Sequence, residues 1–179
     1  MEQIFAPWRI EWVERDDEDA IDGCPFCVLP ERDDDRENRI VARSERGFVL
    51  LNNYPYNPGH AMVIPRRHVA DYPDLTEEEL LDLGRLKQRT LTALGDAMGP
   101  DGFNAGLNLG GAAAGGSIDH VHTHVVPRWS GDTNFMPVVG DTKVVVEALE
   151  RTYDHLRDAF AGQEGATVPD DESRAVRFD

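Results

Sequence analysis

Apolar segments and turn-forming residues alternate through most of the chain in the manner of a β-sheet protein. Five short apolar segments predict strands: Arg39–Ala42, Phe48–Leu51, His60–Pro65, Phe103–Leu109 and about Asp119–Pro127. The sequence NNYPYNPG separates the second strand from the third, and its proline, asparagine and glycine content predicts a turn. Each predicted strand is therefore short and closely followed by a change of direction.

Two helices are expected besides these strands. Thr76 and Glu79 form a capping box at the start of the first helix, and leucines recur at roughly helical spacing until Gly99-Pro100 ends it. The second helix is expected at Thr142–Phe160. Strands in pairs with helices between the pairs indicate an α+β domain, built on an antiparallel sheet of about five strands with two main helices.

The length of 179 residues favours one domain, and 40% hydrophobic residues suffice for a core. We expect this single domain to span residues 1–162 and to include a mixed N-terminal segment, residues 1–38, that carries two cysteines. The remaining residues, 163–179, are polar and acidic, so we expect a flexible tail there.

Acidic residues outnumber basic ones by 34 to 18, which gives a formal net charge of −16. Such a surface argues against nonspecific binding of nucleic acid, which needs a basic footprint, but a small anionic ligand remains compatible with it. The acidic surface suits a salt-rich cytosol, so we expect a halophilic source. No apolar run reaches the roughly 20 residues of a membrane span and no secretory signal is visible, so we expect a cytoplasmic protein without membrane contact.

The segment HVHTHVVPRW contains three of the six histidines within five residues, His120, His122 and His124. Side chains at alternate positions of a strand point the same way, so three imidazoles would lie side by side about 7 Å apart. A run of exposed surface histidines is the simplest alternative. On spacing alone, a three-histidine catalytic metal site and a nucleophilic histidine are equally compatible with the pattern.

A glycine-rich segment, GGAAAGGS, precedes these histidines and ends in Gly115, Gly116 and Ser117. Exposed backbone N–H groups in such turns can cradle phosphate oxygens, and the hydroxyl adds another donor. The position of the loop directly before the histidines favours phosphate chemistry over metal-bound water.

Cys24 and Cys27 are the only cysteines, spaced as CPFC. This spacing is typical either of half a zinc site or of a redox dithiol. No βαβ pattern surrounds the pair, and the neighbouring Asp19 and Asp22 oppose thiolate formation. The zinc reading is therefore favoured, and it requires two further ligands.

The segment G-G-S-x-x-H-V-H-T-H-V-V-P-R at residues 115–128 resembles the signature of the histidine triad family. Upstream segments agree with it, namely Asn52, then Pro58-Gly59-His60, then VIPRRHV at residues 63–69. The extension WSGDTNF after the signature resembles a branch that includes diadenosine tetraphosphate phosphorylases of actinobacteria. The resemblance covers roughly residues 5–160 and implies a HIT-like fold.

The resemblance implies a role for each matching residue. His122 would attack the α-phosphorus and form a covalent nucleotidyl-histidine, with a backbone carbonyl holding its other ring nitrogen. His124 would contact the phosphate or the departing oxygen, and Ser117 and Asn108 would bind phosphate oxygens. Asn52 matches the position that holds the ribose hydroxyls. The reacting centre of this family usually works without a catalytic metal.

Further expectations follow from the same resemblance. His68 and His120 would complete a structural Cys2His2 zinc site with the two cysteines. From their positions in the sequence rather than from the resemblance, Trp129, which directly follows the histidine strand, is a candidate neighbour of the nucleobase, and His60 and His155 are expected to have structural or surface roles. Several family members carry glutamine or another polar residue at the position of Gly116. Without that side chain, one possible hydrogen bond to the leaving group of the substrate is missing. The family also implies a homodimer.

The expected activity is cleavage of dinucleoside polyphosphates, by hydrolysis or by phosphorolysis. Three alternatives stay open from the sequence: a purine nucleoside phosphoramidase, a nucleotide-binding regulatory module with little catalysis, and a zinc hydrolase in which the histidines hold the catalytic metal.

Overall fold

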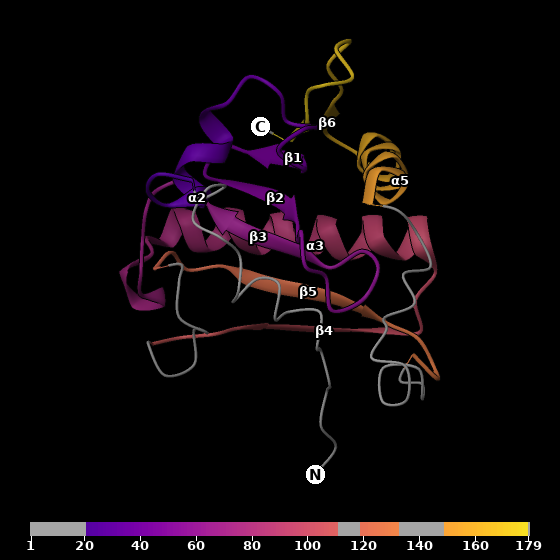
Figure 1. The fold of residues 1–179 in the computed structure, drawn as a ribbon, viewed down its shortest axis with the longest axis horizontal. Coiled ribbons are helices and arrows are strands. Elements are labelled where there is room, and N and C mark those ends of the chain that lie inside the picture. Colours follow the sequence, from indigo (N-terminus) through magenta and orange to yellow (C-terminus); the bar gives the residue numbers. More distant parts are fainter. Residues whose placement is uncertain (1–20, 111–118, 133–148, 179) are drawn as a thin grey trace.

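The computed structural model of the 179-residue chain describes residues 21–110, 119–132 and 149–178 (Figure 1). Its elements follow one another in the order α2 (Pro25–Val28), η3 (Leu29–Glu31), β1 (Ile40–Ser44), β2 (Gly47–Leu51), β3 (Ala61–Pro65), η4 (Tyr72–Asp74), α3 (Glu77–Met98), β4 (Gly102–Leu107), β5 (Thr123–Arg128), α5 (Leu149–Ala161), β6 (Ala166–Thr167) and β7 (Val176–Phe178). Among these helices, none is both long enough and apolar enough to cross a membrane.

The strands form one sheet in the order β4-β5-β3-β2-β1-β7-β6. The five predicted strands are all present as β1 to β5, and they pair antiparallel as expected. The last two strands were not predicted. Strand β7 pairs parallel to β1, so the sheet is mixed and wider than the sequence indicates.

The prediction of a flexible tail over residues 163–179 is wrong for the residues that the structure describes. Val176 and Phe178 are buried, and the backbone N–H of Ala175 donates to the buried carboxylate of Asp35 at 3.0 Å. The Phe178 ring packs against Phe160 of α5, with 6.0 Å between centroids. The apolar alternation at the end of the chain forms a strand because β1 offers it an open edge.

Helix α3 begins where the capping box predicts. The side chain of Thr76 accepts from the N–H of Glu79, and the Glu79 carboxylate accepts from the N–H of Thr76 at 2.9 Å. The helix ends at Gly99, whose φ of 57° is left-handed and whose N–H donates to the carbonyl of Gly95. The second predicted helix is present from Leu149 as α5, and residues 142–148 of the prediction lie outside the described residues.

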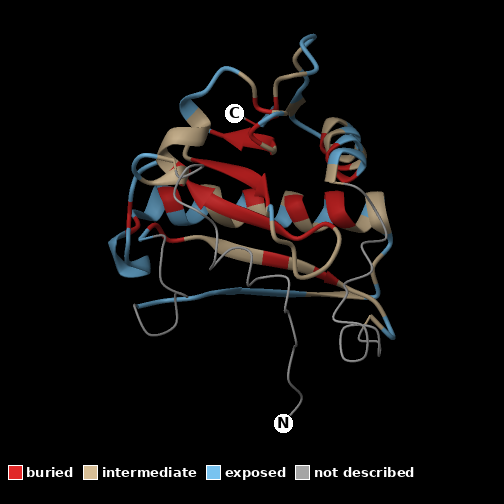
Figure 2. Ribbon diagram, in the orientation of Figure 1, coloured by how far each residue is buried: buried red, intermediate tan, exposed pale blue. Residues whose placement is uncertain are grey.

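The strands at the centre of the sheet are buried on both faces (Figure 2). Val49 and Leu51 of β2 pack toward α3 and α5 in the main core. Phe48 and Leu50 point the other way, into a smaller core that also holds Phe26 of α2. Side chains along β2 alternate between the two faces of the sheet, so this strand contributes to both cores. The smaller core holds the CPFC segment against the sheet.

Candidate active site and metal centre

The three histidines lie at the start of β5, but they do not share a strand as predicted. Strand β5 begins only at Thr123, so His120 and His122 precede it and His124 alone is a strand residue. The rings nevertheless follow one another along one side: Phe26 contacts His120 and His122, with centroids 5.7 and 5.1 Å away, and His122 contacts His124 at 4.7 Å. The predicted row of imidazoles is thus present without the predicted strand.

His122 has a defined tautomer. Its Nδ1 lies 2.8 Å from the backbone carbonyl oxygen of His120. A carbonyl can only accept, so Nδ1 carries the proton and Nε2 keeps its lone pair. Burial lowers the pKa of His122, although the hydrogen bond to His120 opposes this shift. His122 therefore presents a neutral ring with a lone pair at Nε2, as a nucleophile requires.

His124 is held by a residue whose importance the sequence analysis missed, His60. The backbone N–H of Tyr56 donates to Nδ1 of His60 at 3.2 Å, so His60 carries its proton on Nε2. That Nε2 lies 3.0 Å from Nδ1 of His124 and donates to it, which leaves the His124 proton on Nε2. His60 is 1% exposed and is expected from sequence to have only a structural or surface role. No spacing in the sequence relates it to His124, because the two meet only through the pairing of β3 with β5.

Asn108 and Asn52 lie beside this pair. The side-chain amide of Asn108, through its Nδ2, lies 3.3 Å from Nε2 of His124. Asn52 donates its backbone N–H to the carbonyl of His60 at 2.9 Å, while its side-chain oxygen accepts from the N–H of Tyr54. Both predicted substrate-binding asparagines are thus close to the histidines.

The other predicted substrate contacts are placed differently. Gly115, Gly116 and Ser117 lie outside the described residues. Trp129 follows the far end of β5, roughly 16 Å along an extended strand from His124. Its proposed contact with a nucleobase stays a prediction.

Arg128 and Asp132, which flank Trp129, have a structural role in this region. Arg128 forms a bidentate ion pair with Asp132, at 2.6 and 2.9 Å, and this pair holds the pKa of the Asp132 carboxyl down to about 2. Asp132 also accepts from the side chain of Asn57 at 2.8 Å. The charge of Arg128 is therefore already neutralised, and the bonds connect the NNYPYNPG turn to the end of β5.

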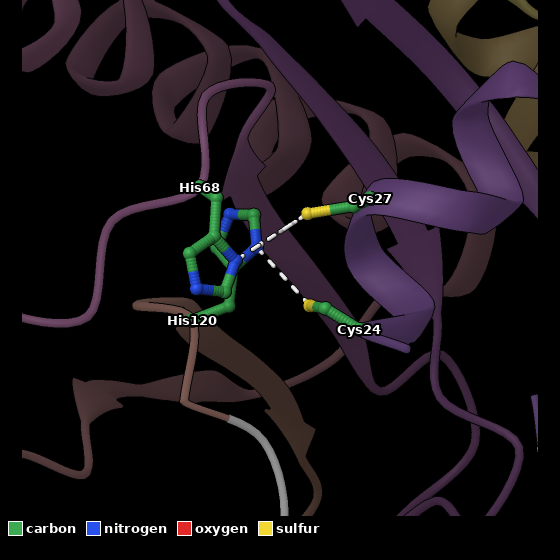
Figure 3. Close-up of side chains that lie close together, drawn as sticks. All are labelled: Cys24, Cys27, His68 and His120. Atoms are coloured by element: carbon green, nitrogen blue, oxygen red, sulfur yellow. Dashed lines mark hydrogen bonds between the residues drawn. The ribbon is translucent and has the colours of Figure 1, made fainter. Parts of the chain in front are cut away.

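Three further side chains join His120 in a cluster that could hold a metal ion, namely Cys24, Cys27 and His68 (Figure 3). Their ligand atoms all lie within 4.8 Å of one another. The Sγ of Cys24 is 3.5 Å from Nδ1 of His120, and the Sγ of Cys27 is 3.4 Å from Nδ1 of His68. The segment of α2, the segment after β3 and the segment before β5 meet at this point, as Figure 3 shows.

His120 is oriented to serve as a ligand. Its Nε2 donates to the carbonyl oxygen of Pro65 at 2.9 Å, so the lone pair of Nδ1 faces the cysteines. Burial lowers its pKa to about 4, which keeps the ring neutral. The three histidines therefore direct their Nδ1 atoms to different partners: the cysteines, a carbonyl and His60. This divergence argues against the alternative in which they jointly hold a catalytic metal.

Residues 34–131 match the family model described as the HIT domain, and the chain therefore belongs to the histidine triad (HIT) family. Its sequence is 38% identical over 169 residues to the AP-4-A phosphorylase of Mycobacterium tuberculosis, covering 91% of this chain and 86% of that enzyme. It is also 28% identical over 153 residues to the asymmetrical bis(5'-nucleosyl)-tetraphosphatase of Schizosaccharomyces pombe, covering 78% of this chain and 80% of that protein.

Solved structures agree with this assignment. A Zn-bound histidine triad family protein from Mycobacterium smegmatis superimposes with a TM-score of 0.62 at 27% identity, covering 78% of this chain and 94% of that chain. The α+β, HIT-like fold predicted from the sequence is confirmed.

Proposed function

We propose that the protein cleaves dinucleoside polyphosphates, such as diadenosine tetraphosphate, at the α-phosphate through a nucleotidyl-His122 intermediate. One observation carries the proposal: the Nδ1 proton of His122 is held by the His120 carbonyl at 2.8 Å, which leaves Nε2 as a neutral nucleophile. The similarity to AP-4-A phosphorylase over 91% of the chain supports the substrate class.

In the first step, Nε2 of His122 forms a bond to the α-phosphorus while the bond from phosphorus to the bridging oxygen breaks. The departing phosphate chain takes that electron pair, and the Nε2–H of His124 donates a hydrogen bond to it. The ring of His122 becomes cationic, and its Nδ1–H stays bonded to the His120 carbonyl, which stabilises the charge. Asn108, with Ser117 from the loop, would bind the other phosphate oxygens.

In the second step, an oxygen of water or of inorganic phosphate bonds to the phosphorus and the phosphorus–nitrogen bond breaks, and an attacking water releases one proton to the solvent. The Nε2 lone pair is thereby restored. Water yields a mononucleotide, whereas phosphate yields a nucleoside diphosphate. The other product is the shortened nucleotide in both cases.

We also propose that the cluster of Cys24, Cys27, His68 and His120 holds a structural zinc ion. Zinc–sulfur bonds of about 2.3 Å and zinc–nitrogen bonds of about 2.0–2.1 Å place sulfur and nitrogen about 3.6 Å apart in a tetrahedron. The observed separations of 3.4, 3.5 and 3.7 Å fit this value. All four positions are filled by protein, which is typical of a structural site. The ion would fasten α2 to the segment that carries His122.

The test of the activity is a product assay by 31P NMR on diadenosine tetraphosphate, with and without inorganic phosphate. AMP together with ATP indicates hydrolysis, and ADP together with ATP indicates phosphorolysis. Identical products under both conditions contradict phosphorolysis. His122→Asn should abolish turnover but retain nucleotide binding, while His155→Asn on α5 serves as the matched control. Mass spectrometry should locate the trapped adenylyl group on His122.

Two other outcomes would replace the proposal. Faster turnover of an adenosine phosphoramidate than of diadenosine tetraphosphate would identify a purine nucleoside phosphoramidase. Wild-type protein that binds nucleotide without a burst or turnover would identify a regulatory module.

We further propose a homodimer formed along β4. This strand is at one edge of the sheet, and residues 104–107 are exposed, as the pale blue of β4 in Figure 2 shows. An exposed edge strand presents unpaired backbone groups that a second strand can bond. Light scattering after size exclusion should give twice the chain mass of 20.0 kDa. A monomer mass at every concentration would contradict the dimer.

A further inference from the structure

A hollow of about 410 Å³ opens against β1 and β7. None of its lining residues belongs to the smaller hollow of about 50 Å³ that His122 lines. Five arginines line it: Arg32, Arg43, Arg66, Arg174 and Arg177. The whole chain has only 18 basic residues and a formal charge of −16. So many arginines around one hollow therefore contrast with the rest of this acidic protein.

Most of the nearby carboxylates are already engaged by arginines. Three pairs account for them: Asp33 with Arg174 at 3.7 Å, Glu45 with Arg46 at 3.2 Å, and Asp35 with Arg43. Glu31 is the remaining acidic residue of the lining. Within the described part of the chain, Arg66 and Arg177 form no ion pair, and Arg32 bonds only the neutral side chain of Asn38. The hollow thus has an excess of positive charge.

Two of these arginines are aligned by the sheet. Arg43 of β1 and Arg177 of β7 are register partners in the parallel pair, on strands about 4.8 Å apart. Arg43 is only 9% exposed, and its Nε and Nη2 are bound by Asp35 and by the carbonyl of Pro30. Its Nη1 forms no hydrogen bond with the described residues. Asp35 neutralises the charge of Arg43, so the uncompensated positive charge on these two neighbouring strands is that of Arg177, and an anion bound there would compensate it.

We propose that this hollow is a second binding site, for an oligophosphate anion such as inorganic triphosphate or the phosphate chain of a nucleotide. The planar guanidinium group binds phosphate oxygens in pairs, and several of them match a ligand with several charged groups better than a single carboxylate. Arg43 is a rigid, buried donor, whereas Arg66 and Arg177 are exposed and can close on the ligand. This site does not depend on the proposed reaction at His122.

The test is isothermal titration of the full-length protein at low ionic strength, with inorganic triphosphate as one probe and ATP as the other. The test variants are Arg66→Ala and Arg177→Ala. The control is Arg85→Ala, which removes the same charge from an exposed position of α3 outside the hollow. Each of the two lining variants should weaken triphosphate binding about tenfold, the effect of losing one charged hydrogen bond. Arg85→Ala should change it less than twofold.

The two probes distinguish the source of the phosphate. If the lining variants weaken the binding of both, an oligophosphate chain alone is recognised, and if they weaken only ATP, the site is for a nucleotide. If neither probe is affected by either variant, the proposal is wrong. A second measurement needs no variant: triphosphate should protect Arg66 and Arg177 of the wild-type protein from phenylglyoxal, as mapped by mass spectrometry. Equal labelling with and without triphosphate would also overturn it.

Discussion

The hydrogen bond from His60 to His124 gives the sharpest test of the histidine arrangement, because two substitutions of His60 separate its bond to His124 from its bond to Tyr56. The amide of glutamine can place a donor where Nε2 of His60 lies, so His60→Gln retains the bond to His124. The side chain of asparagine is shorter, so His60→Asn retains an acceptor for the N–H of Tyr56 but loses the bond to His124. Both variants remove the same buried ring.

The expected loss follows from the bond that disappears. A net hydrogen bond contributes about 0.5–1.5 kcal/mol to a folded state, and a donor aimed at developing charge contributes about 2.7–4 kcal/mol in a transition state. The donor to the departing phosphate is His124, and His60→Asn acts on it only through the bond between the two rings. We therefore expect a loss of transition-state stabilisation between these two limits. This corresponds to a fall in kcat of roughly tenfold to a hundredfold, with a small change in KM. His60→Gln should recover most of the kcat.

The assay is steady-state turnover of diadenosine tetraphosphate, accompanied by the 15N chemical shifts of the His124 ring. The shifts should report a proton on Nε2 in the wild type and in His60→Gln, and a mixture of tautomers in His60→Asn. Equal kcat values for the two variants, together with unchanged shifts, would show that His60 only fills space. The NMR arm tests the tautomer even if another substrate proves to be the physiological one.

Three further predictions concern the metal, the C-terminal strand and the acid limit of stability. Cys24→Ser should lose the zinc ion proposed for the cluster and lower the Tm, as measured by metal analysis and calorimetry, and zinc content equal to that of the wild type would contradict the ligand set. Phe178→Ala should destabilise the fold by about 3 kcal/mol in urea unfolding because its ring is 6% exposed, whereas Val168→Ala, at a position 44% exposed, should have little effect. Equal effects would show that β7 does not belong to the core. Arg67 holds the pKa of the Glu79 carboxyl down to about 2 from 4.5, so this pair stabilises the fold above pH 4.5 and its contribution is lost as the pH falls from 4.5 toward 2. Glu79→Gln should flatten the pH dependence of stability in that window, and an unchanged acid unfolding curve would contradict the assignment.

The sequence predicts elements well where the signals are local. Thr76 and Glu79 mark the start of α3 to the residue, and Gly99 marks its end, because capping and a left-handed φ depend on neighbours in the chain. The apolar segments of β1 to β3 are also local signals. The C-terminal strand is different, because its three residues are stable only against the edge of β1.

The candidate site divides in the same way. The alternation of His120, His122 and His124 is visible in the sequence, but the point at which β5 begins is decided by the partner strands β3 and β4. The role of His60 depends on a contact across 64 positions of the chain. The arginine hollow likewise combines segments from η3, β1, the end of β3 and β7, which no spacing in the sequence relates.

His120 takes part in both centres described above, with its ring among the cysteines and its carbonyl oxygen bonded to His122. An ion in the cluster would therefore fix the main chain that selects the tautomer of the nucleophile. Removing zinc from the cluster with a chelator should slow turnover, although every group that touches the substrate is still present. Adding zinc back should restore the turnover rate. The activity of this enzyme would then follow the supply of zinc in the cell that makes it.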